Sequence, residues 1–111
     1  MKNVVFSDKV KQTPDLYTKA VRATEVLDRV LGTSADQVAA KWDAPEDDKS
    51  GRLLTLRISD WTGARSATLE TSELEQPTQL GFRFYRLWGD LLQDRNEKQL
   101  RELLGTSGPG E

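Results

Sequence analysis

Large apolar side chains are densest over residues 80–104, in the segment LGFRFYRLWGDLLQDRNEKQLRELL. At 3.6 residues per turn this pattern predicts a helix with two neighbouring apolar faces. The first face carries Leu80, Phe84, Leu87 and Leu91. The second face carries Phe82, Tyr85, Trp88 and Leu92. Because a small domain has one core to fill, two apolar faces on one helix need two partners. The second partner is either another part of this chain or a second molecule.

The same segment leaves two alternatives open. Leu80, Phe82 and Phe84 also alternate as in a strand, but the helical period continues through Gln93 and favours the helix. Past Leu92 the apolar stripe shifts to the opposite side of the helix. The helix therefore either breaks near 93–96, with a last short helix over 97–104, or continues, so that Leu103 extends the second face. Gly105 closes the helix in either case.

A second helix is predicted over residues 14–31. Pro14 suits the first helical position after Thr13, which suits the N-cap. Apolar residues then recur at helical spacing: Leu16, Ala20, Ala23, Leu27 and Leu31. Before this helix, residues 4–6 form a short apolar run that fits either an edge strand or a docked tail.

Residues 34–43 fit two structures. Ser34 and Gln37 have the spacing of a capping box, which favours a helix. Val38, Ala40 and Trp42 alternate with more polar neighbours, which favours a half-buried strand. The polar segment 44–51 reads as a loop into the next strand. A strand over 34–43 that this loop joins to the next strand is therefore narrowly favoured over a helix.

The strongest strand pattern covers residues 52–70, with a turn at 60–63. A register that pairs Ser59 with Ala64 brings the apolar positions of the two strands opposite each other, Leu56 with Ala67 and Leu54 with Leu69. A slip by one residue would mix apolar and polar positions. The sheet should therefore have one apolar face and one polar face.

Together these elements predict an α+β fold. We expect an N-terminal helix, a three-stranded antiparallel β-meander near 37–70, and a C-terminal helix or broken helix pair packed on one sheet face. The length of 111 residues fits a single domain over 1–105, followed by a flexible Gly/Pro/Ser tail over 106–111.

Composition removes several kinds of chemistry. The chain has no His and no Cys, so it lacks the commonest general base, the thiolate nucleophile and the commonest soft metal ligands. A net charge of −2 gives no general attraction to nucleic acid or to an anionic membrane. The apolar runs are too short for a membrane span or a signal peptide. We expect a soluble, cytoplasmic protein without cofactor or metal.

Carboxylates gather in sequence near the predicted hairpin, at Asp60, Glu70, Glu73 and Glu75. Paired carboxylates can perform acid–base chemistry or bind a hard cation. The spacing of a calcium loop is absent, and a solvated surface explains these residues more simply. A pocket that gathers Asp60, Glu70 and Arg57 would favour a carboxylate enzyme or small-ligand site.

Two further features bear on binding. Arg83 and Arg86 flank aromatic residues, a combination that stacks on single-stranded nucleic acid, although core aromatics beside surface arginines explain it better. Trp61 lies at the tip of the predicted hairpin, where it either anchors a partner or folds back on its own sheet.

The leading hypothesis is a non-enzymatic interaction domain. It would self-associate, as in a homodimer, or bind a protein partner through Trp61, Phe82, Tyr85, Trp88 and Leu92. The alternative is a single-stranded nucleic-acid binder that uses Arg83 and Arg86, which the net charge disfavours. A carboxylate-based site ranks third.

Overall fold

The computed structural model describes residues 1–45 and 51–105. The predicted tail, 106–111, and most of the predicted loop, 46–50, lie outside these residues. The elements follow one another as β1 (Asn3–Phe6), α1 (Asp8–Lys11), α2 (Pro14–Leu31), the 3-10 turn η1 (Gly32–Gln37), β2 (Ala39–Asp43), β3 (Leu53–Asp60), β4 (Gly63–Glu70), the 3-10 turn η2 (Glu73–Glu75) and α3 (Pro77–Gly105). The α+β class is confirmed.

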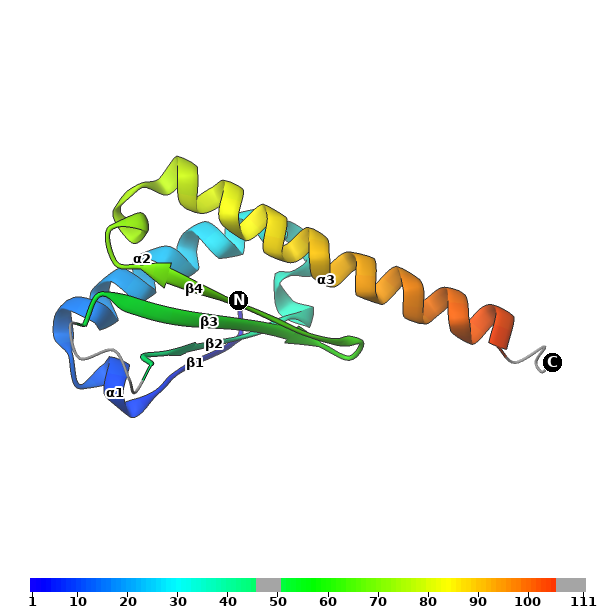
Figure 1. Cartoon of the computed structure of the whole chain (residues 1–111), viewed down its shortest axis with the longest axis horizontal. Coiled ribbons are helices and arrows are strands. Elements are labelled where there is room, and N and C mark those ends of the chain that lie inside the picture. The colour runs from blue at the N-terminus through cyan, green and yellow to red at the C-terminus, as the bar shows by residue number, and fades with distance from the viewer. Residues whose placement is uncertain (46–50, 106–111) are drawn as a thin grey trace.

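The sheet has four strands in the order β1-β2-β3-β4, so the prediction of three antiparallel strands was wrong. The fourth strand is β1, which pairs in parallel with β2, with Val5 opposite Lys41. The chain therefore begins with a strand and not with a helix. Parallel neighbours need a long crossover, and α2 provides it by running back over the sheet (Figure 1).

The antiparallel part of the sheet matches the sequence pattern. Residues 39–43 form the strand that was narrowly favoured, and the competing helix is limited to the 3-10 turn η1. The hairpin of β3 and β4 has the predicted register, with Ser59 opposite Ala64 and Leu54 opposite Leu69. Leu54, Leu56 and Ile58 are fully buried, as a sheet with one covered face requires.

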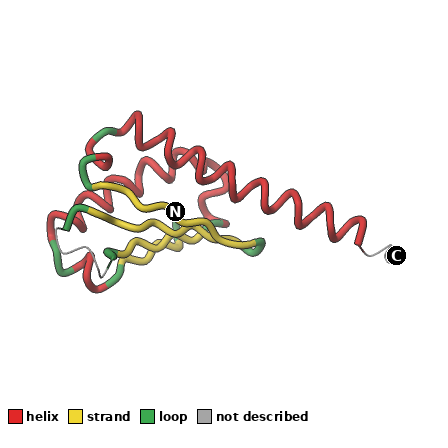
Figure 2. The backbone as a smooth tube through the Cα atoms, in the orientation of Figure 1, coloured by secondary structure: helices red, strands yellow, loops and turns green. Residues whose placement is uncertain are grey.

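Both long helices cover the same face of the sheet (Figure 2). The predicted apolar positions of α2 are buried, and Ala20 and Ala23 leave room for close packing. Trp42 of β2 is fully buried and donates from its indole nitrogen to the hydroxyl of Thr24 on α2 at 2.9 Å. Thr24 in turn donates to the carbonyl of Ala20 at 2.8 Å. This chain of hydrogen bonds fixes α2 over the sheet while satisfying the buried indole.

The first turn of α2 differs in one detail from the prediction. Thr13 occupies the N-cap position but its side chain makes no capping bond. Its hydroxyl donates instead to the carbonyl of Lys9, the second residue of α1. The short helix α1 thus takes the side chain that would otherwise cap α2.

The C-terminal segment is one continuous helix, α3, so the broken-helix alternative was wrong. Its first apolar face, Leu80, Phe84, Leu87 and Leu91, is buried in the core. Phe84 meets Trp42 edge-on, with ring centroids 6.3 Å apart. At 1.5 Å per residue the helix is about 43 Å long. Its C-terminal part extends past the tip of the β3–β4 hairpin (Figure 1).

Candidate functional site

The outward side of α3 carries large apolar side chains that are more than half exposed in the described part of the chain. Phe82 is 72% exposed, Tyr85 70% and Leu103 75%, and Leu100 and Leu104 are also more than half exposed. At 100° per residue these five positions fall on one side of the helix, opposite the buried face. We call the outer stripe the positions on this side at spacings of three and four: Phe82, Tyr85, Gly89, Leu92, Asn96, Leu100, Leu103 and Leu104.

The predicted second apolar face is split by the structure. Trp88 is 7% exposed and belongs to the core, and Leu92 is half-buried against it. The guanidinium of Arg95 lies 5.4 Å from the Trp88 ring and covers its remaining side. Trp88 is thus covered by its own chain, whereas Phe82 and Tyr85 remain exposed. Of this predicted face, the structure leaves the aromatic pair and the edge of Leu92 accessible.

Two crossed ion pairs hold the middle of α3 on the β3–β4 hairpin. Arg95 donates to Asp60 Oδ2 at 2.6 and 3.2 Å, and Arg65 donates to both oxygens of Asp94 at 2.7 Å. The side chain of Asp60 has no exposed surface and also accepts from the backbone N–H and the hydroxyl of Thr62. Burial alone would raise the pKa of Asp60, but the hydrogen bonds from Thr62 and Arg95 outweigh it and hold that pKa below its usual range.

Trp61, at the tip of the hairpin, stays 57% exposed. The ammonium of Lys98 lies 5.4 Å from the centre of its ring, a cation–π contact with α3. The side chain therefore leans toward the helix without being buried. Trp61 lies at the base of the segment of α3 that projects beyond the sheet.

The projecting end of α3 begins near Asn96. From Asn96 to Leu104 every side chain is exposed. Leu100, Leu103 and Leu104 lie in this segment, so three large apolar side chains extend into solvent beyond the body of the domain. An isolated helix of this length is marginally stable in water.

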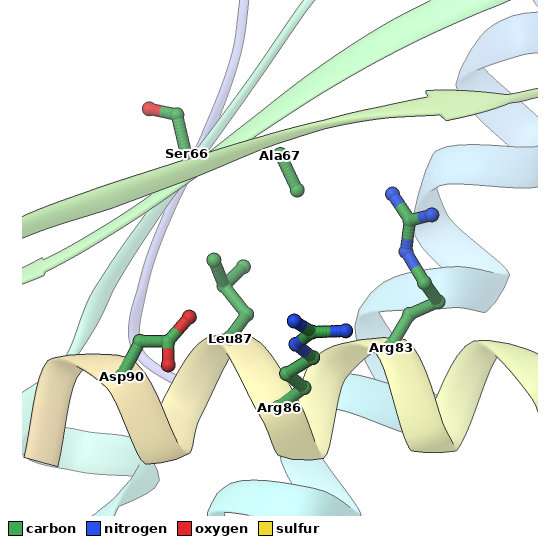
Figure 3. A pocket seen from close by; sticks show the side chains of 6 residues that line it. All are labelled: Ser66, Ala67, Arg83, Arg86, Leu87 and Asp90. Carbon is green, nitrogen blue, oxygen red and sulfur yellow. The ribbon is translucent and has the colours of Figure 1, made fainter.

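The two arginines of the nucleic-acid hypothesis differ in their contacts. Arg83 donates to the carbonyl of Thr68 at 3.0 Å and pairs with Glu73 at 3.4 Å, so it covers the open edge of β4. Within the described part of the chain, Arg86 has no ion-pair partner within 4.0 Å. Figure 3 shows both at the rim of a small hollow, where Leu87 and Ala67 point toward each other from α3 and β4. Arg83 is already engaged by Thr68 and Glu73, so of the two arginines Arg86 alone is available to a phosphate group.

The carboxylates do not converge. Asp60 is buried under Arg95, Glu75 pairs with Lys19, and Glu73 accepts from the backbone of Glu70. Arg57 lines a hollow on the open face of the sheet, whereas Glu70 lines a different one beside Arg52. Across residues 1–45 and 51–105, no cluster of three or more acidic side chains has the arrangement of a metal site. The pocket that a carboxylate enzyme needs is not formed by these residues.

Sequence reasoning left the projecting leucines out of the candidate site. The signal was present, because Leu100 and Leu104 lie opposite the core face if the helix is straight. A break at 93–96 would have turned them inward, and that alternative hid them. The structure adds Leu100, Leu103 and Leu104 to Phe82 and Tyr85.

Comparisons with family models, with curated proteins and with solved structures found no match for this chain. In the part of the chain that is described, no helix combines the length and the apolar composition that crossing a membrane requires.

Proposed function

We propose that this chain is a non-enzymatic interaction domain that binds a protein surface through the outer stripe of α3. The observation that carries the proposal is the exposure of Phe82 and Tyr85 on a helix whose opposite face is already buried. Contiguous exposed apolar patches mark interaction sites, and aromatic side chains are enriched among the residues that dominate binding energy.

The way α3 is held supports this proposal. The ion pairs of Asp60 with Arg95 and of Arg65 with Asp94 fix the helix on the hairpin, and Arg83 fixes its N-terminal half on β4. The part of the outer stripe from Phe82 to Asn96 is thus presented on a rigid element. Binding to a preorganised surface loses less conformational entropy, so more of the contact energy appears as affinity.

The size of the patch also supports it. Five large side chains are more than half exposed, in two groups: Phe82 with Tyr85 and, about 22 Å farther along the helix, Leu100, Leu103 and Leu104. With about 150–250 Å² for a large side chain, their exposed area is on the order of 600 Å². A stable interface buries about 800 Å² per partner, so the patch with its polar rim is of the required size.

Site-specific photo-cross-linking tests the proposal. A photoreactive amino acid replaces Tyr85 or Leu103, with Lys41 on the open sheet face as the matched control, in cells that produce the chain. We expect protein adducts from the two α3 positions and none from Lys41. Phe82→Ser in the same chain should abolish the adduct at Leu103. Adducts with a second copy or with another protein both support the proposal. Equal labelling at Lys41, or no adduct at α3, overturns it.

A further inference from the structure

Resting on the proposed function, we propose that the occupant of the outer stripe is a second copy of this chain. The two α3 helices pack antiparallel about a two-fold axis between Leu92 and Gln93. An isologous interface of this kind uses the same patch on both copies, so the patch must be complementary to itself. Three features of the outer stripe and its edge meet that condition: its apolar pattern, the small residue Gly89, and the opposite charges of Arg86 and Glu97.

The apolar positions match across this axis. Counting outward from it in both directions sets Phe82 of one copy level with Leu103 of the second and Tyr85 level with Leu100. Each aromatic side chain thus meets a leucine of the projecting end. The stripe also repeats about every 3.5 residues through Phe82, Gly89, Asn96 and Leu103, the period that keeps two helices in contact along a seam.

Gly89 is explained by this arrangement and not by the fold of one chain. A Cβ atom added at Gly89 would meet nothing within 4 Å among the described residues. Glycine inside a helix costs about 1 kcal/mol relative to alanine. In the antiparallel pair Gly89 lies level with Asn96 of the second copy, where a missing side chain lets the two helices approach closely.

One pair of opposite charges beside the stripe, Arg86 and Glu97, fits the antiparallel arrangement. Arg86 and Glu97 lie on the same edge of α3, and neither has an ion-pair partner within 4.0 Å among residues 1–45 and 51–105. The antiparallel pairing brings Arg86 of one copy within one helical turn of Glu97 of the second. In a parallel two-fold pair, Glu97 of the second copy would lie on the opposite edge of the seam and about 16 Å farther along it, out of reach of Arg86. The contact between Arg86 and Glu97 therefore forms in the antiparallel arrangement and not in the parallel one.

The groove beside Phe82 receives the end of the second helix. It is lined by Glu73, Gln79, Phe82, Arg83 and Arg86. Leu104 of the second copy comes level with this groove in the antiparallel pair. The projecting end of α3 in each copy is then covered by the body of the other copy. In a parallel pair the two projecting ends would contact only each other.

Sedimentation equilibrium and cysteine cross-linking test the proposal on the full chain. The natural chain has no cysteine, so each introduced thiol is unambiguous. We expect the wild-type chain to be a dimer and Phe82→Ser to raise its dissociation constant at least tenfold, while Lys41→Ser leaves it unchanged. Circular dichroism checks that both variants keep the fold.

The orientation is read from two single-cysteine variants, Phe82→Cys and Leu103→Cys. In the antiparallel pair the two copies of either residue lie about 30 Å apart, too far for a disulfide. We therefore expect cross-linking when the two variants are mixed and none when either is alone. Cross-linking of each variant alone would overturn the antiparallel arrangement. If the chain is a monomer at every concentration, the proposal that a second copy occupies the outer stripe is overturned. The proposed function would still stand if photo-cross-linking at Tyr85 gave adducts with a different protein.

Discussion

The hydroxyl of Thr24 connects the indole of Trp42 to the backbone of α2. Thr24→Val keeps the shape of the side chain but leaves the indole N–H without its acceptor in the core. We expect the free energy of unfolding to fall by about 1–3 kcal/mol. Thr18→Val, at an exposed position of the same helix, serves as the control and should change it by less than about 0.5 kcal/mol. Urea unfolding followed by tryptophan fluorescence measures both.

Asp60 holds the buried end of the ion pair with Arg95. Asp60→Asn removes the charge while leaving a guanidinium that is 16% exposed. We expect a loss of about 1–3 kcal/mol, because the mostly shielded guanidinium of Arg95 loses its charged hydrogen-bond acceptor. Asp94→Asn removes the corresponding exposed pair with Arg65 and should cost clearly less. Equal losses in urea unfolding would contradict the role given to burial.

The same carboxylate makes stability depend on pH. The pKa of Asp60 is lowered in the folded chain, so the unfolded chain takes up the proton first as the pH falls. Its stabilising effect is complete above the usual aspartate pKa of about 3.9 and is lost as the pH falls through the folded value. The difference in unfolding free energy between wild type and Asp60→Asn should be constant from pH 7 to 5 and shrink below pH 4. A constant difference down to pH 2 would refute this assignment.

At the scale of elements, replacing two helix glycines by alanine should change the free energy of unfolding in opposite directions. Gly89 lies inside α3 with open space around it, so Gly89→Ala should raise the unfolding free energy of the monomer by about 1 kcal/mol. Gly32 ends α2 with a φ of 58°, which a side chain disfavours, so Gly32→Ala should lower it by about 1–2 kcal/mol. Urea unfolding at low protein concentration checks both. Two changes of the same sign would contradict the backbone conformations described for these helices.

The elements that could be predicted are those whose pattern is local. The hairpin register followed from the alternation of Leu54 and Leu56, because a slip by one residue would have turned polar groups to the core. The strand β1 could not be assigned in the same way. It has four residues, and its pairing with β2 depends on a crossover of more than thirty residues. No local spacing specifies that pairing.

The candidate site was predictable in part, for a similar reason. Helical spacing identified the two apolar faces of α3, but it did not specify which one its own chain covers. Trp88 is covered by the core and Arg95, whereas Phe82 and Tyr85, on the far side of the helix, are not. The division depends on where α2 and the hairpin meet α3, which is set by the tertiary fold.

At the scale of the whole molecule, the domain has one covered sheet face and one helix, α3, that extends beyond the sheet on which it packs (Figure 1). The body ends with the hairpin tip, where Lys98 lies over Trp61. The last turns of α3 have only exposed side chains. A helix end whose side chains are exposed frays more readily than a buried one, so its stability in the free monomer should be among the lowest in the fold.

Amide hydrogen exchange over residues 98–105, measured across protein concentrations that span dissociation and association, tests this account most directly. If a second copy covers the outer stripe, protection of these amides should be low in the dilute chain and rise steeply with concentration. Protection in β3, which lies in the core, should serve as the internal reference and change far less. Fast exchange over 98–105 that stays the same at every concentration would contradict the proposal that two copies join through α3.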